Sequence, residues 1–396
     1  MSFYTDVLNY EKVKTLAADI DHIDLSTTKI IKDPDVAAAT ALSIYNNNDI
    51  STEALIEAGK RRKKAYRKNN IIGFVPIYLT NHCDGECKMC GMRKNNDSLV
   101  RQFSTPSMID EQLKFLYEQQ HMRGVAFLTG EYNDGFARSA NAFIVGYALR
   151  RALDFGFKTV YMNIGSLQPE YMEIIADFIK PEDRHRVAMC VNQETYNETM
   201  YTRFMAQEGD AFKANFKNRI DSHDSWSKMG FVSHQIGSLL GVNKDVGEEV
   251  AGLIAHAKYL MSTTAKTVFF SLPRLNPALG TSNKKLVQDD ALVRVIATLA
   301  FVAPESAVMM TTRETRELQD QVMPLLGCLA PGTPEVGGYL NDPEMMPNNE
   351  KVAQFRISDT RMPRDTFERV EANTEFNILD FVSENNRAET GLVANH

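Results

Sequence analysis

Eight short apolar segments recur along the chain, and segments with helical spacing separate them. The expected strands are 71–80, 125–129, 159–164, 187–191, 232–237, 268–272, 308–312 and, more weakly, 327–330. Helical patterns between them include 109–121, 140–155, 248–261 and 289–301. Continuous apolar strands that alternate with helices are typical of a parallel sheet covered on both faces. Eight such units predict an α/β fold, a (β/α)8 barrel of the TIM type, with an open doubly wound sheet as the alternative.

The barrel pattern leaves an extension at each end of the chain. Residues 1–70 contain two helical segments, about 35–45 and 51–68, and are expected to form an N-terminal helical extension. Residues 71–335 are expected to form the barrel. Residues 336–396 are polar and rich in proline without a clear period, and we expect them to pack on the barrel as a C-terminal extension.

Charge and hydropathy exclude some classes of partner. The formal net charge of −7 argues against a nucleic-acid-binding surface, which would be basic. No apolar run is long enough to span a membrane. Residues Met1 to Tyr10 lack the apolar core of a secretion signal. We therefore expect a cytoplasmic protein that binds neither nucleic acid nor membrane.

A cysteine-rich loop follows the first expected strand. Cys83, Cys87 and Cys90 have the spacing C-x3-C-x2-C. In a large chain without an export signal, such spacing indicates metal binding rather than disulfides, and the two remaining cysteines are expected to be plain buried thiols. Three thiolates around a four-iron cubane leave one iron open to a chelating molecule. Structural zinc needs four ligands, and His82 is poorly placed as the fourth. The loop predicts one 4Fe–4S cluster, with a zinc site or chance clustering as the alternatives.

Polar groups follow several expected strands, and in a barrel the chemistry lies at these C-terminal strand ends. They include Gly130 and Glu131, Asn163 and Ser166, Glu194, Arg274 and Arg313. A glutamate accepts hydrogen bonds from an amine or a ribose, whereas arginine binds carboxylates through two parallel bonds. Arg274 and Arg313 are therefore candidates for the carboxylate of an amino-acid substrate. A structural ion pair is the alternative for Arg274.

The cysteine loop and the turn 129–131 resemble the radical S-adenosylmethionine (SAM) superfamily. Residues 193–196 and 273–274 resemble its branch of aromatic amino acid lyases, which includes the tyrosine lyases of thiamine and hydrogenase-cofactor synthesis. Residues 74–78, 86–90, 127–132, 163–166 and 311–314 are most similar to tryptophan lyases, which make 3-methyl-2-indolic acid for natural product biosynthesis.

The resemblance implies a lyase that cleaves SAM reductively and uses the 5′-deoxyadenosyl radical to take hydrogen from the amine of a free aromatic amino acid. L-Tryptophan is the expected substrate, and a tyrosine lyase or a related lyase of another amino acid is the alternative. A non-catalytic iron–sulfur or zinc-binding protein is a remote alternative. The implied cofactors are one 4Fe–4S cluster and SAM, with an electron donor such as flavodoxin or ferredoxin.

The resemblance also assigns residues. Arg313 and Tyr78 would act at the substrate, with Arg274 and Ala330 beside them. By match of position, Glu131 would bind the SAM amine and Glu194 the ribose. The other expected cofactor-binding residues are Gly130, Asn163, Ser166 and, from the affinity of arginine for carboxylates, Arg219 for the SAM carboxylate. Arg219 stands in a long charged stretch with helical spacing, and a surface arginine is its alternative.

Two positions depart from the family pattern. Met89 replaces the aromatic residue common before the last cysteine, a feature that the tryptophan lyases share. Ala330 stands where the tryptophan lyases have a serine near the substrate. Since hydrogen-bonding sites discriminate strongly, its loss is expected to shift the substrate or the product. No cysteine follows Cys328, which argues against the second cluster of the hydrogenase-assembly tyrosine lyase.

Overall fold

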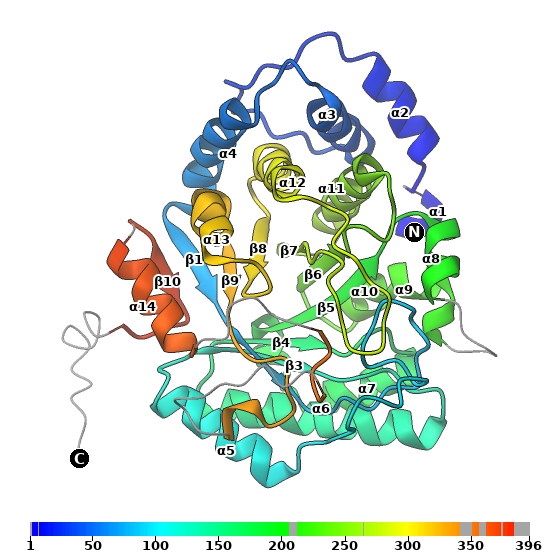
Figure 1. Cartoon of the computed structure of the whole chain (residues 1–396), viewed down its shortest axis with the longest axis vertical. Helices are drawn as coiled ribbons and strands as arrows, with labels where there is room; N and C mark the ends of the chain where they lie inside the picture. Colours follow the sequence, from blue (N-terminus) through cyan, green and yellow to red (C-terminus); the bar gives the residue numbers. More distant parts are fainter. Residues whose placement is uncertain are drawn as a thin grey trace.

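The computed structural model describes residues 2–6, 8–205, 212–263, 265–340, 351–355, 362–373 and 375–383. Within them, ten parallel strands form one sheet in the order β10-β1-β9-β8-β7-β6-β5-β4-β3-β2 (Figure 1). The strands are β1 (Asn70–Gly73), β2 (Val75–Tyr78), β3 (Gly124–Leu128), β4 (Thr159–Asn163), β5 (Val187–Glu194), β6 (Ser233–Ser238), β7 (Thr267–Ser271), β8 (Ala307–Thr311), β9 (Cys328–Ala330) and β10 (Asn377–Leu379).

One extended segment joins the two sides of the sheet. Only Phe74 separates β1 from β2, and β1 pairs with β9 whereas β2 pairs with β3. The strands therefore enclose a barrel, which confirms the expected fold and makes the open doubly wound alternative wrong. Every expected strand is present, and the weakly patterned last one is the short β9.

Helices surround the sheet and follow the strands in turn. They are α5 (Pro106–Glu118), α6 (Gly135–Phe155), α7 (Pro169–Asp177), α8 (Glu198–Met205), α9 (Phe216–Ile220), α10 (Ser222–Lys228), α11 (Val246–Thr263), α12 (Asp289–Val302) and α13 (Arg316–Val322). Local sequence explains the ends of α6. The Asp134 carboxylate accepts from the first backbone N–H groups, and Gly156 ends the helix with a φ of 99°.

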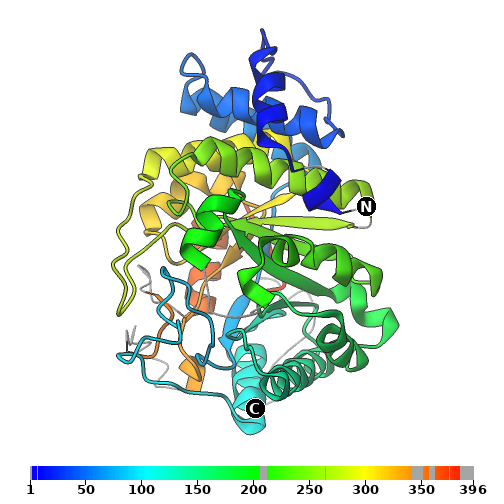
Figure 2. The same ribbon diagram turned by 90° about the vertical axis from the view of Figure 1, so that its right-hand side faces the viewer.

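The N-terminal helices lie outside this layer. They are α1 (Phe3–Asp6), α2 (Tyr10–Ala18), α3 (Pro34–Asn46) and α4 (Thr52–Arg67). Figure 2 shows the blue N-terminal helices on the outer side of the green and yellow helices α11 and α12. Arg294 of α12 fixes the turn between α3 and α4, because its guanidinium donates to the carbonyls of Ile44 and Asn47 at 2.8 and 2.6 Å.

Part of the expected C-terminal extension, residues 341–350, 356–361, 374 and 384–396, lies outside the described residues. The remainder contains regular structure that the absence of a period did not predict. α14 (Pro363–Asn373) precedes β10, which pairs with β1. Residues 351–355 lie beside the cysteine loop, where the Val100 N–H donates to the Lys351 carbonyl at 2.7 Å and the Asn81 amide donates to the Val352 carbonyl at 3.0 Å.

Aromatic side chains fill part of the barrel interior. The ring of Tyr161 stacks on Phe74 at 4.1 Å and meets the edge of Phe269 at 5.6 Å. Barrel chemistry is expected at the C-terminal ends of the strands. No helix of the described residues has both the length and the apolar character needed to cross a membrane.

A buried histidine cluster, formed by His223, His234 and His256, lies outside the sheet. The Nδ1 atoms of His223 and His234 are 3.1 Å apart, and His256 Nδ1 is 3.0 Å from the Tyr196 hydroxyl. Phe3 of α1 stacks on His256 with 4.3 Å between ring centroids. This contact attaches the first helix to the barrel.

Candidate active site

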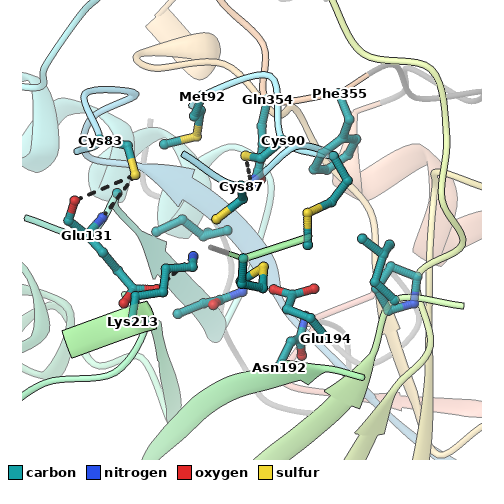
Figure 3. A pocket seen from close by; sticks show the side chains of 18 of the residues that line it. Cys83, Cys87, Cys90, Met92, Glu131, Asn192, Glu194, Lys213, Gln354 and Phe355 are labelled. Carbon is teal, nitrogen blue, oxygen red and sulfur yellow. Dashed lines mark hydrogen bonds and ion pairs between the residues drawn. The ribbon is translucent and has the colours of Figure 1, made fainter. Parts of the chain in front are cut away.

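The outer cavity lies at the C-terminal ends of the strands and has a volume of about 990 Å³, including its open mouth. Figure 3 shows Cys83, Cys87 and Cys90 gathered at one end of this cavity. The sulfur of Cys83 accepts from the N–H groups of Gly85 and Glu131 at 3.2 and 3.4 Å. Such hydrogen bonds stabilise sulfur in its negatively charged form.

The loop fits a 4Fe–4S cluster held by three thiolates. Burial raises the pKa of Cys87 to about 11, against an opposing effect of Lys213, so a bound cation is needed to keep the thiolate at neutral pH. The turn after β3 presses against the loop. A Cβ on Gly130 would lie 2.0 Å from the His82 carbonyl oxygen and 2.6 Å from the Cys83 Cβ. Only glycine allows this approach.

A charged cluster, formed by Glu131, Lys213, Arg219 and Glu194, lines the outer cavity beside the cysteines. Glu131 Oε1 is 2.9 Å from Lys213 Nζ and 2.7 Å from Arg219 Nη1. Arg219 Nη2 also reaches Glu194 Oε1 at 3.4 Å. Burial alone would raise the pKa of Glu131, but Lys213 and Arg219 hold it below its ordinary value. The cluster therefore offers carboxylates and cations side by side.

Arg219 lines the outer cavity beside the cysteines, but its burial and its helix differ from the expectation. It is 3% exposed, so the alternative of a surface arginine is wrong. It belongs to α9, which has five residues, so the expected long charged helix is also wrong. Arg219 Nε donates to the carbonyl of Asn192 at 2.8 Å, and this bond fixes the guanidinium at the end of β5.

Glu194 is aimed by an irregular strand end. The register of β5 against β6 shifts between Asn192 and Glu194, and Glu194 has a φ of 71°. Its carbonyl accepts from the Leu239 N–H at 2.8 Å and from the Ser238 hydroxyl at 3.2 Å. Bulges re-aim side chains, and a left-handed backbone in a residue other than glycine is strained and gathers at functional sites.

The inner cavity, of about 680 Å³, adjoins the outer one inside the barrel. Tyr78 and Arg313 line both, with the tail residue Phe355. The Tyr78 hydroxyl donates to Gln354 Oε1 at 2.9 Å, and Gln354 Nε2 donates to Cys90 Sγ at 3.5 Å. The guanidinium of Arg313 stacks over Phe355 at 3.4 Å. The predicted substrate residues therefore stand where the two cavities meet.

Arg274 lies at the site but is engaged in ion pairs. It is 1% exposed, and its guanidinium pairs with Glu314 and with Asp289, the latter at 2.6 Å. It also donates to the carbonyl of Val287 at 3.0 Å. This geometry favours the structural ion pair over the predicted role in substrate binding.

The remaining predicted residues divide by position. Asn163 lines both cavities, and Ala330 lines the inner one. Ser166 does not line either cavity and instead donates to Glu131 Oε2 through its hydroxyl at 3.3 Å. Ser166 therefore positions Glu131.

Sequence reasoning missed Lys213 and Gln354. Lys213 lies in the short 3-10 helix Phe212–Ala214, and Gln354 lies in the tail. Neither follows a strand, so the strand-end rule gave no signal for them. Asn192 and Gln235 also line the inner cavity, and Asn192 lies in β5 two positions before Glu194.

Comparisons with known proteins find similar sequences and folds. The Biotin and Thiamin Synthesis associated domain family matches residues 271–372. The 2-iminoacetate synthase of Escherichia coli (strain K12) is 24% identical over 358 residues, which cover 88% of this chain and 86% of that protein.

Two solved structures share the fold. The FeFe-hydrogenase maturase HydG superposes with a TM-score of 0.75 at 20% identity, covering 92% of this chain and 79% of that one. Methylornithine synthase (PylB) superposes with a TM-score of 0.65 at 14% identity, covering 93% of this chain and 97% of that one. In its cysteine loop, its barrel and these likenesses the chain is similar to radical SAM enzymes, which use a 4Fe–4S cluster and SAM.

Proposed function

We propose that the protein is a radical SAM lyase that breaks the Cα–Cβ bond of a free aromatic amino acid, with tyrosine favoured over tryptophan. The observation that carries the proposal is the junction of the two cavities. Cysteines and the charged cluster line the outer cavity, whereas the inner one is mostly apolar, and Tyr78 and Arg313 stand between them. Such a site suits an amino acid whose head faces the cofactors and whose side chain enters the barrel.

The name of the curated relative indicates the reaction type. 2-Iminoacetate is the part of an α-amino acid that remains when the side chain leaves Cα and the amine becomes an imine. The same loss from tyrosine would leave a hydroxybenzyl fragment, which becomes p-cresol by taking up one electron and one proton from the reductant. This relationship supports the tyrosine alternative better than the conversion of tryptophan to 3-methyl-2-indolic acid.

The bound cofactors would supply a 5′-deoxyadenosyl radical at the junction. The methionine part of SAM carries an ammonium and a carboxylate close together. Glu131 and Arg219, which touch each other, complement this pair of charges, and Glu194 is placed for the ribose. Arg313 would bind the substrate carboxylate, and Tyr78 would line the substrate pocket beside it. Held in this way, the substrate amine faces the outer cavity.

An anaerobic assay with reconstituted cluster, SAM and dithionite tests the proposal. We expect tyrosine to stimulate release of 5′-deoxyadenosine and to yield p-cresol together with glyoxylate, the hydrolysis product of 2-iminoacetate. Formation of 3-methyl-2-indolic acid from tryptophan would favour the second substrate instead. If no amino acid stimulates cleavage of SAM, the lyase proposal is wrong.

Arg313→Gln provides the residue-level test, with Arg150→Gln as the matched control. Arg150 is an arginine on the outer helix α6 that pairs with Asp154. We expect Arg313→Gln to raise the KM for the amino acid by roughly tenfold or more, because a charge-assisted bidentate contact is lost. Arg150→Gln should leave KM unchanged.

A further inference from the structure

A group of apolar side chains, called its floor, lines part of the inner cavity. Phe74, Ala126, Cys190, Met309 and Ala330 line this cavity and belong to one apolar cluster inside the barrel. Gln235 of β6 lines the same cavity. It pairs in register with Cys190 on one side and with Phe269 on the other, both members of that cluster. A strongly polar side chain therefore stands within an apolar layer.

The amide of Gln235 is buried and lacks a hydrogen bond at its oxygen. Gln235 is 3% exposed, and among the described residues no group donates to its Oε1 atom. Its neighbours His234 and Ile236 point to the outer side of the strand, where His234 contacts Ser227 of α10. Buried polar side chains are nearly always hydrogen-bonded, and exceptions need an explanation. A ligand donor that enters the cavity is such an explanation.

We propose that Gln235 is a specificity-determining residue, which selects an aromatic amino acid whose ring carries an O–H or N–H donor at its far end. This inference rests on the proposed lyase function. The substrate head lies at Arg313, at the junction of the cavities, and the ring extends toward the floor. The phenol of tyrosine or the indole N–H of tryptophan then donates to Gln235 Oε1. Phenylalanine has the same shape as tyrosine without the donor, so it leaves the buried amide unpaired.

The other polar groups of the inner cavity are less suited to this role. Asn163 and Asn192 line both cavities and so stand at their junction, although Asn192 Oδ1 is also buried without a donor among the described residues. Ser271, Thr311, Thr312 and Thr333 carry hydroxyls at or beyond the ends of their strands. Gln235 precedes the end of β6 by three positions and is deeper in the barrel. The amide of Gln235 is thus the group that distinguishes an aromatic ring with a hydrogen-bond donor from a ring without one.

Binding without turnover tests the inference directly. The protein with reconstituted cluster and SAM, but no reductant, is titrated anaerobically with tyrosine, tryptophan and phenylalanine by calorimetry. We expect tyrosine to bind at least about tenfold more tightly than phenylalanine, because a site built around a buried polar group rejects the analogue that leaves it unpaired. Gln235→Met, which keeps the length and removes the acceptor, should reduce this ratio to about one. Met309→Leu, on the same floor, should preserve it.

The outcomes separate the two claims. A ratio that falls in Gln235→Met and persists in Met309→Leu supports the inference. An equal affinity for tyrosine and phenylalanine in the natural protein, or an unchanged ratio in Gln235→Met, overturns the inference and leaves the lyase function intact. If no aromatic amino acid binds and none stimulates cleavage of SAM, the proposed function fails and the inference fails with it. Circular dichroism and SAM binding confirm that Gln235→Met is folded.

Discussion

Replacing Arg274 by methionine distinguishes a structural arginine from a substrate clamp. The guanidinium is buried and donates through Nε to Glu314 at 3.0 Å, with a second bond to the same carboxylate. Glu314 is itself 5% exposed, so Arg274→Met leaves a buried carboxylate without its partner. Breaking such a pair costs about 3–5 kcal/mol. Asp289 adds about 1 kcal/mol or less, because its side chain is half exposed.

The assay is urea unfolding of the cluster-free protein, followed by circular dichroism. We expect Arg274→Met to lower the free energy of unfolding by about 3–5 kcal/mol, while the double variant Arg274→Met with Glu314→Leu recovers most of the loss, since an apolar pair needs no counter-charge. The affinity of the folded single variant for tyrosine should change by less than about threefold, the change expected of a residue outside the contact. A stable single variant that binds tyrosine more than about tenfold less tightly would refute this reasoning.

Three further predictions follow from the site and its surroundings. Gly165→Ala would place a Cβ 2.1 Å from the Glu131 carboxyl group at a φ of 78°, so we expect SAM affinity to fall by roughly tenfold or more in equilibrium dialysis, whereas Gly230→Ala, at a φ of 87° in open surroundings, should only reduce stability. Burial lowers the pKa of His223 to about 4 and also lowers the pKa values of His234 and His256, so below about pH 6.5 the unfolded chain binds protons that the folded chain does not. Above pH 7 the free energy of unfolding should not depend on this cluster. Toward pH 4 the free energy of unfolding should fall by up to about 1.4 kcal/mol for each pH unit and each histidine. A slope that stays unchanged in His223→Gln would contradict this prediction. Gln354→Leu removes the hydrogen-bond donor to the Cys90 thiolate. This change should lower the midpoint reduction potential of the cluster by roughly 20–40 mV, measured in a redox titration followed by electron paramagnetic resonance. An unshifted potential would show that the bond is absent in the cluster-loaded protein.

The barrel could be predicted from sequence because its strands are buried on both faces. Each strand therefore carries a continuous apolar run, and its end can be located within one or two residues, except in β5, which continues to Glu194, three residues beyond the expected end. The C-terminal extension behaves differently. Helix α14 buries little beyond Phe367 and Val370, so its apolar period is too sparse to recognise.

The predicted site residues came from the strand ends, where topology alone brings distant side chains together. Glu131, Glu194 and Arg313 were found for this reason. Lys213 and Gln354 come from segments whose path depends on tertiary packing, and local sequence does not encode that path. The partners of Arg274 also follow no local pattern, and the arginine was therefore assigned to the substrate.

The pairing of β10 with β1 bears on how the chain is made. Asn70 and Asn377, which face each other across these strands, are 307 positions apart. At ribosomal rates of about 5–20 residues per second, β10 emerges roughly 15–60 s after β1. For most of that interval, until β9 emerges, β1 also lacks β9, so both of its edges display unpaired backbone groups that invite association with other chains. Slow translation, or synthesis without chaperones, should therefore lower the yield of folded protein more than a substitution in the active site would.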